Sequence, residues 1–174
     1  MFKVLDDVCK PTKGSKFSAA IDLYASQDAV IGAGETVKVP LGVCIDIDID
    51  WYMGNKINKN PTYGQGAIDA FEDFMKSHYF ELEPRSRMRL KGITAGTGVI
   101  DLDYKDEICI VFHNLLTFKA IVKWIFSFGR NKSVFKISKG EKIAQILLKE
   151  HKTYLMGIDT QEERTGGFGS TDKK

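Results

Sequence analysis

The chain has 174 residues, 43% hydrophobic and 28% charged, which is the size and composition of one globular domain rather than of a disordered segment. Lys and Arg number 25 against 23 Asp and Glu, so the net charge of +2 is too small to coat a nucleic acid. The most apolar stretch, 115–128, is short and contains Lys119 and Lys123, which excludes a transmembrane helix there. The first ten residues contain Asp6 and Asp7 and no long apolar run, so we expect no signal peptide.

The N-terminal half alternates apolar and polar residues with the period of two that indicates strands. A first strand is predicted at Phe2 and Val4, reaching toward Val8. A longer run spans 37–50, and Pro40 and Gly42 predict a bend within it. One face of that run consists of Val43, Ile45, Ile47 and Ile49.

Two segments interrupt this strand pattern and predict helical insertions. The first, about 51–78, begins polar and then repeats apolar residues at helical spacing. Its predicted apolar face consists of Ala67, Ala70, Phe71 and Phe74. The second, about 115–131, has a longer amphipathic face that Gly129 ends. That face consists of Leu115, Phe118, Val122, Ile125 and Phe126.

Further strands are predicted at 108–112 and 143–148, with 135–137 leading into the second. Many short strands separated by glycine-rich turns favour an all-β domain, a sandwich, jelly roll or barrel, which we expect over residues 1–158. The polar, glycine-rich segment 159–174 is expected to be a mobile tail that acts as a lid.

Three scattered cysteines, Cys9, Cys44 and Cys109, make a poor disulfide framework and favour small buried thiols in a reducing compartment. We therefore expect a cytoplasmic protein, in the host cytoplasm if the chain is viral. The histidines are isolated, so no protein-built zinc site is expected.

Five short segments are unusual for their composition, and each is weak evidence alone. They are AAIDLYA (19–25), PRSRM (84–88), GTGVIDLDY (96–104), KGEKIAQ (139–145) and RTGGFGST (164–171). In this order and spacing they resemble the five motifs of the homotrimeric dUTPase family. The resemblance implies a jelly-roll-like homotrimer with shared sites, which hydrolyses dUTP to dUMP and pyrophosphate and so limits uracil in DNA and supplies dUMP.

An aspartate held near the α-phosphorus could orient and deprotonate the attacking water. Spacing alone leaves Asp101 and Asp103 as candidates, and the resemblance assigns the general base to Asp101. It also assigns uracil recognition to the Gly98 N–H and the Ile100 C=O, on a predicted hairpin, and the sugar contact to Tyr104. Strand alternation places Asp101 and Tyr104 on opposite faces, so a shared pocket requires a turn or bulge between them.

A triphosphate needs donors and positive charge from several directions. The predicted phosphate-binding set consists of Arg85, Ser86, Arg87, Gln145, Arg164, Gly167, Gly169, Ser170 and Thr171. Phe168 is predicted to stack on the uracil ring, which makes the tail a lid. The resemblance places Asp22 near the catalytic aspartate, where it would hold water around a Mg²⁺ that the triphosphate brings. Arg87 occupies a position where the family has glycine, so either the turn differs or Arg87 adds charge near the phosphates.

Two other functions stay open. A related dCTP deaminase would need an acid/base glutamate near the base, and Glu107 is the nearby candidate. A nucleotide-sensing or regulatory protein could keep the same pocket and use 115–131 for an additional protein contact. Neither direct nucleic-acid binding nor membrane binding is expected.

Overall fold

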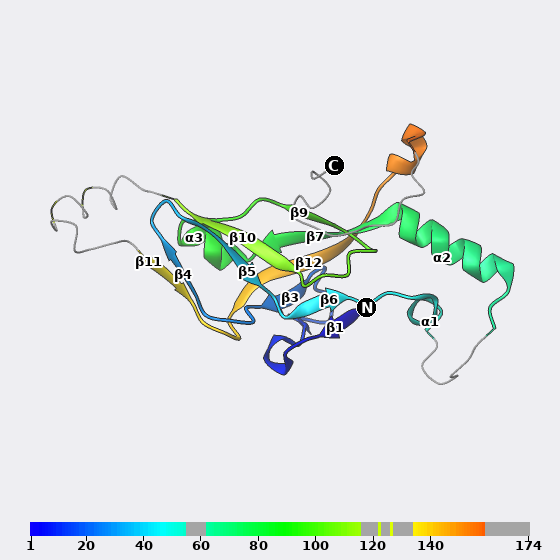
Figure 1. The fold of residues 1–174 in the computed structure, drawn as a ribbon, viewed down its shortest axis with the longest axis horizontal. Coiled ribbons are helices and arrows are strands. Elements are labelled where there is room, and N and C mark those ends of the chain that lie inside the picture. The colour runs from blue at the N-terminus through cyan, green and yellow to red at the C-terminus, as the bar shows by residue number, and fades with distance from the viewer. Residues whose placement is uncertain (55–61, 116–121, 123–125, 127–133, 159–174) are drawn as a thin grey trace.

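The computed structural model describes residues 1–54, 62–115, 122, 126 and 134–158, and strands dominate these residues (Figure 1). Three α-helices accompany them there: α1 (Ile49–Tyr52), α2 (Gln65–Ser77) and α3 (Ser86–Leu90). Two short 3-10 helices are η1 (Asp7–Cys9) and η2 (Thr153–Met156). The strands are β1 (Phe2–Val4), β2 (Thr12–Lys13), β3 (Ile21–Tyr24), β4 (Ala29–Gly32), β5 (Thr36–Pro40), β6 (Val43–Ile45), β7 (His78–Pro84), β8 (Ile93–Thr94), β9 (Gly98–Asp101), β10 (Cys109–Asn114), β11 (Val134–Ile137) and β12 (Lys142–Glu150).

The strands pair antiparallel in sheets whose neighbours are often distant in the sequence. The largest sheet has the order β2-β3-β12-β7-β9, and a second has the order β5-β10-β8. β11 pairs with β4, and β1 pairs with β6. The predicted all-β class is therefore confirmed, and the predicted strands at 108–112, 135–137 and 143–148 correspond to β10, β11 and β12.

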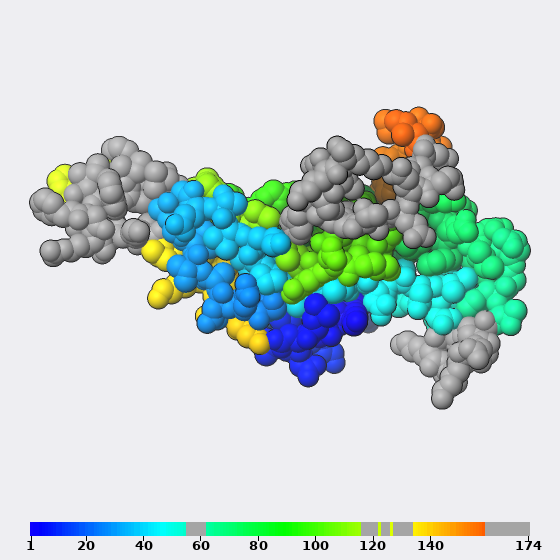
Figure 2. All heavy atoms as spheres, viewed as in Figure 1, coloured from blue at the N-terminus to red at the C-terminus, as the bar shows by residue number. Residues whose placement is uncertain are grey.

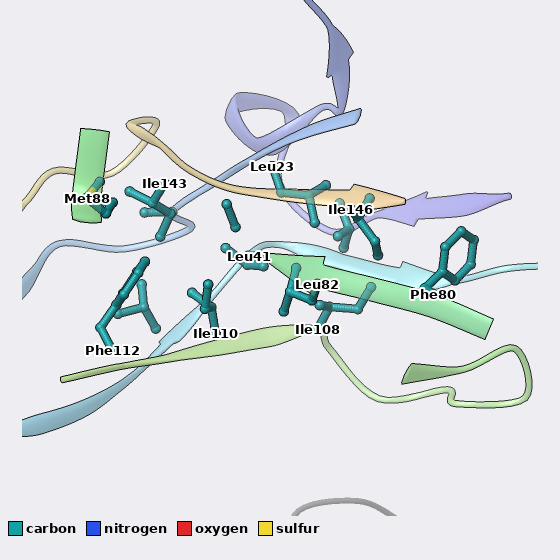
Figure 3. Packing of buried hydrophobic residues seen from close by; sticks show 14 of the residues in the cluster. Leu23, Leu41, Phe80, Leu82, Met88, Ile108, Ile110, Phe112, Ile143 and Ile146 are labelled. Carbon is teal, nitrogen blue, oxygen red and sulfur yellow. The ribbon is translucent and has the colours of Figure 1, made fainter. Parts of the chain in front are cut away.

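The core lies between the large sheet and the β5-β10-β8 sheet. On β7, Phe80, Leu82 and Pro84 are buried, while Glu81 and Glu83, which alternate with them, are half-buried, as a one-sided strand requires. Figure 3 shows Leu82 and Ile146 of the large sheet facing Ile110 of β10 across one apolar layer. This layer fixes the register of β7 and β12, because a one-residue slip would expose every core side chain.

The long run at 37–50 differs from its prediction at its C-terminal end. The buried face is correct at Val43, Ile45 and Ile47, but regular pairing ends at Ile45. Asp48 then begins a helix, because its carboxylate accepts a hydrogen bond of 2.7 Å from the Trp51 N–H. Ile49 is consequently in α1 and not in a strand.

Val8 is a second difference, because it lies in the 3-10 helix η1 and not in the first strand. Asp6 caps that helix by accepting from the Val8 N–H at 3.1 Å. The sequence pattern missed the Asp48 cap because an aspartate at every second position also fits a strand with one polar face.

The first insertion does form a helix, α2, and its contacts correct one predicted residue. Phe71 and Phe74 pack against Tyr52 of α1, with ring centroids 5.7 and 5.2 Å apart. Ala70, however, is exposed, and Ile68 and Met75 are half-buried in its place. α1 and α2 lie together at one end of the molecule (Figures 1 and 2). The second insertion lies outside the described residues except for Leu115, Val122 and Phe126.

All three cysteines are free thiols; Cys9 is fully buried, whereas Cys44 and Cys109 are half-buried. Burial raises the pKa of each thiol above its usual range. None of the helices in the described part of the chain is long and apolar enough to cross a membrane.

Candidate active site

Two of the five segments meet at one pocket. Arg85, Ser86 and Arg87, from PRSRM, line it together with Lys142 and Gln145, from KGEKIAQ. Its volume is about 210 Å³. Two arginines, a lysine, a hydroxyl and an amide give it donors and positive charge, which suits a phosphate-bearing ligand.

α3 determines how the PRSRM segment enters the pocket. The chain leaves β7 at Pro84 and turns into α3, which the fully buried Met88 fixes to the core. Arg87 lies in the first turn of this right-handed helix, so the turn differs from one that would need a glycine. Its guanidinium forms an ion pair with Glu141, which directly precedes the pocket residue Lys142 at the start of β12.

An irregularity in β12 brings Lys142 and Gln145 to the same face. Residues three apart in a regular strand point to opposite faces. Here the register shifts by one between Lys142 and Ala144, so that Lys142 pairs with Tyr24 and Gln145 with Asp22. Tyr24 and Asp22 share a face of β3, and the bulge therefore places both β12 side chains over that face.

Asp22 supplies the negative charge beneath this pocket. Its side chain is 7% exposed and forms ion pairs with Arg85 and, at 3.2 Å, with the Lys142 ammonium. A carboxylate this buried requires such partners, because an unpaired buried charge is strongly unfavourable. Asp22 thus holds two of the pocket's cations in place.

The residues around Asp22 fit a metal carried by a ligand better than a metal held by the protein alone. Within the described ranges no three His, Cys, Asp or Glu side chains lie close enough together to form a metal cluster. Both carboxylate oxygens of Asp22 accept from cationic side chains. The fit is to an ion such as Mg²⁺ that phosphate oxygens and water coordinate, with one carboxylate nearby.

β9 carries the segment predicted to bind the base, and it lies at the edge of the large sheet beside β7. Gly98 and Ile100 are two residues apart, so their backbone N–H and C=O groups point to the same side of the strand. The predicted hairpin is wrong, because β10 pairs with β5 and β8 and belongs to another sheet. The chain must cross between sheets after Asp101, since Ile108 is already buried in the core.

The predicted turn between Asp101 and Tyr104 is confirmed. The Tyr104 N–H donates to the Asp101 C=O at 3.1 Å, which closes a tight turn over Leu102 and Asp103. Asp101 is exposed at the end of β9. Tyr104 is 7% exposed and packs in the hydrophobic core, so its contact with a sugar stays a prediction.

The two halves of the predicted site lie at opposite ends of β7. Asp101 is the register partner of Tyr79, near the start of β7, whereas Arg85 follows the last residue of β7. At ~3.3 Å per residue the two positions are about 20 Å apart along the strand. One chain therefore does not bring the predicted general base to its own phosphate pocket.

Glu107 has a structural role that the sequence did not reveal. Its Oε1 accepts from the Gly42 N–H at 2.7 Å and from the Ser26 hydroxyl at 3.2 Å. Gly42 has a φ of 65°, in the left-handed region, so this contact stabilises a turn that favours glycine. Because its carboxylate already accepts these two hydrogen bonds within the fold, Glu107 is a poor acid/base group for a deaminase.

The predicted residues of the tail, Arg164, Gly167, Phe168, Gly169, Ser170 and Thr171, lie outside the described residues. Sequence reasoning missed Lys142 as a pocket residue and Glu141 as the partner of Arg87. The first was hidden by the β12 bulge. The second depends on a contact across the fold that no local pattern reveals.

Comparisons with known proteins agree with this geometry. A dUTPase family model matches residues 67–172. A deoxyuridine 5'-triphosphate nucleotidohydrolase of Candida albicans is 31% identical over 94% of this chain and 80% of its own length. The Saccharomyces cerevisiae protein of that name is 30% identical over 92% of this chain and 85% of its own length.

Solved structures show the same fold at lower identity. A dUTPase from phage phi11 of S. aureus superposes with a TM-score of 0.59 at 16% identity, covering 98% of this chain and 97% of its own. The dUTPase from Streptococcus mutans gives 0.53 at 20% identity, covering 86% and 94%. The matched residues include the phosphate pocket and β9, and the chain belongs to the dUTPase family.

Proposed function

We propose that this chain hydrolyses dUTP to dUMP and pyrophosphate by attack of water on the α-phosphorus. The observation that carries the proposal is that PRSRM and KGEKIAQ converge on one cationic pocket in a member of the dUTPase family. In the cell, the reaction would keep uracil out of DNA and supply dUMP. The free thiols suit a cytoplasmic location.

The phosphate pocket would bind the triphosphate through charge and hydrogen bonds. Arg85, just before α3, and Arg87, within it, donate with the Ser86 hydroxyl between them, and Lys142 and Gln145 donate from β12. Arg85 and Lys142 would exchange the Asp22 carboxylate for phosphate oxygens. Asp22 would then be available to water near the phosphates, where Mg²⁺, when bound, neutralises phosphate charge.

The base and the water would be handled by the other half of the site. The Gly98 N–H and the Ile100 C=O match one acceptor and one donor of the uracil edge, and cytosine reverses that pattern. Each mismatch in a buried site costs about 1–3 kcal/mol. Asp101 would take a proton from the attacking water, and Tyr104 would exclude the 2′-hydroxyl.

We propose a homotrimer in which different chains complete each site. The position of Asp101 and Arg85 at opposite ends of β7 supports this arrangement, because one chain supplies only half of the groups to a site. Segment 159–174 would close over the bound nucleotide, with Phe168 on the uracil ring and Arg164, Ser170 and Thr171 on the phosphates.

The test is a pyrophosphate-release assay with dUTP, dCTP, dTTP and UTP, with and without Mg²⁺. We expect turnover of dUTP alone, and its loss when a chelator removes the metal. Asp101→Asn should abolish turnover while dUTP still binds. Cleavage of dTTP and dCTP at the rate of dUTP would refute the proposal.

A sensing function that keeps the pocket without catalysis is the second candidate. Binding of dUTP with no pyrophosphate release would favour it. Release of ammonia from dCTP would instead indicate the deaminase, which the scaffold contacts of Glu107 disfavour.

A further inference from the structure

Glu83 is a carboxylate next to the phosphate pocket that the proposed reaction does not use. It lies in β7, two residues before Arg85, and its side chain is 18% exposed. Its register partner on β12 is Gln145, a pocket residue, so the two share one face of the sheet. A negative charge beside a site for polyanions is unfavourable for binding unless it has a compensating role.

The two oxygens of Glu83 bind two different elements. Oε2 accepts from the Arg89 guanidinium of α3, in an ion pair. Oε1 accepts from the Thr97 hydroxyl at 2.6 Å. Thr97 directly precedes Gly98, the first residue of β9, so one side chain links the phosphate-binding helix to the base-binding strand.

The three arginines in and next to α3 each pair with a different carboxylate. Arg85 pairs with Asp22, Arg87 with Glu141 and Arg89 with Glu83. Arg85 and Arg87 line the pocket and would turn to the phosphates, whereas Arg89 does not line it. The Arg89–Glu83 pair would therefore persist when nucleotide binds, and it can keep α3 in place while its neighbours change partners.

We propose that Glu83 is a positioning residue, which fixes the start of β9 to α3 and thereby orients the Gly98 N–H toward the base. This inference rests on the proposed function, and it adds a determinant of base recognition that acts through Thr97. In the proposed trimer α3 and β9 of one chain serve neighbouring sites, so each Glu83 supports two of them.

The first test does not depend on catalysis. It measures how the Glu83–Thr97 contact holds the start of β9, by amide hydrogen exchange of 97–101 in the nucleotide-free full-length protein. Thr97→Val retains the branched shape and removes the hydroxyl, and we expect exchange there to accelerate about tenfold. Glu83→Ala should act in the same way. Glu83→Gln retains an acceptor for Thr97, and exchange should stay near that of the unmodified chain.

The second test is kinetic. Thr97→Val should raise KM for dUTP about three- to tenfold, the effect of one lost hydrogen bond, with kcat changed much less. The preference for dUTP over dCTP should narrow in the same variant. A general loss of stability would instead lower the amount of active enzyme and leave KM unchanged.

Glu81→Gln is the matched control. Glu81 lies on the same face of β7 and pairs with Lys149 at 3.3 Å, but neither residue lines the phosphate pocket. It should alter neither the exchange of 97–101 nor KM. Unchanged exchange of 97–101 in Thr97→Val and Glu83→Ala would overturn the proposal even if the unmodified protein cleaves dUTP. Faster exchange in these variants, in a protein that does not turn over dUTP, would support the positioning role of Glu83 and refute only the proposed function.

Discussion

At the scale of single residues, the buried carboxylate of Asp22 decides how the pocket is held together. It forms ion pairs with Arg85, just before α3, and with Lys142 of β12, and each of these cations is itself partly exposed. Its charge is stabilised only because both partners are present. The pocket's cations are in turn kept close together, despite their mutual repulsion, because this carboxylate lies between them.

We therefore expect Asp22→Asn to lower the free energy of unfolding by about 1–3 kcal/mol, because it replaces the buried, charged acceptor of two cationic side chains with a neutral amide. Urea denaturation followed by fluorescence measures the change. Glu72→Gln serves as the control, since the Glu72–Lys76 pair is exposed on α2 and should contribute less than about 0.5 kcal/mol. An Asp22→Asn variant as stable as the control would show that the Asp22 pairs do not stabilise the fold.

The thiol of Cys9 gives a prediction about pH. Burial raises its pKa in the folded chain above the ordinary value of 9.0, so the folded state keeps the proton after the unfolded state has lost it. Stability should then be unaffected well below pH 9 and fall as the pH rises above it. Urea midpoints at pH 8 and pH 10 should differ less in Cys9→Ala than in the unmodified chain. Equal pH dependence in both would contradict the assignment.

At the scale of elements, the sequence predicted strands better than their ends. Periodicity located β10, β11, β12 and the helix α2, because each buries one face and repeats accordingly. It failed where a capping side chain stopped a strand, at Asp48, because aspartate at alternate positions fits both a strand and a cap. It also failed at the β12 bulge, since an added residue is visible only from the register of the neighbouring strand.

The aromatic contacts of α2 predict which face of the inserted helix matters. The ring centroid of Phe74 lies 6.1 Å from that of Trp51 and 4.6 Å from that of His78, on which Phe74 stacks. Phe74→Ala should cost about 1–3 kcal/mol, less than a fully buried phenylalanine because its side chain is half-exposed. Ala70→Ser, on the exposed face, should cost less than about 0.5 kcal/mol. Thermal unfolding of both variants checks this, and the reverse order would place the wrong face inward.

At the scale of the whole molecule, the sequence predicted four of the five residues that line the phosphate pocket, Arg85, Ser86, Arg87 and Gln145, but not their arrangement. The resemblance of the five segments supplied the residues, whose roles stay predictions. Their placement depends on long-range pairing, which puts Asp101 and Arg85 at the two ends of β7. The role of Glu107 in the Gly42 turn was likewise hidden, because the partners are far apart in the sequence.

Mixed assemblies test whether sites are shared. Asp101→Asn and Arg85→Ala should each be inactive alone, since each lacks one half of every site. Refolding equal amounts together should restore about a quarter of full activity, because chance combination leaves some sites with both native residues. Size-exclusion chromatography with light scattering would establish the trimer in each sample. No recovery from properly mixed trimers would show that each chain completes its own site.

The pairing of pocket cations with Asp22 and Glu141 has one last consequence, for ligand selection. Each arginine already has an anionic partner at rest, so a lone monovalent anion gains little by replacing one of them. A chain of linked phosphates can displace several partners in a single encounter. The resting ion pairs thus act as a threshold on ligand valence, and inorganic phosphate should compete poorly with a nucleotide even at high ratios.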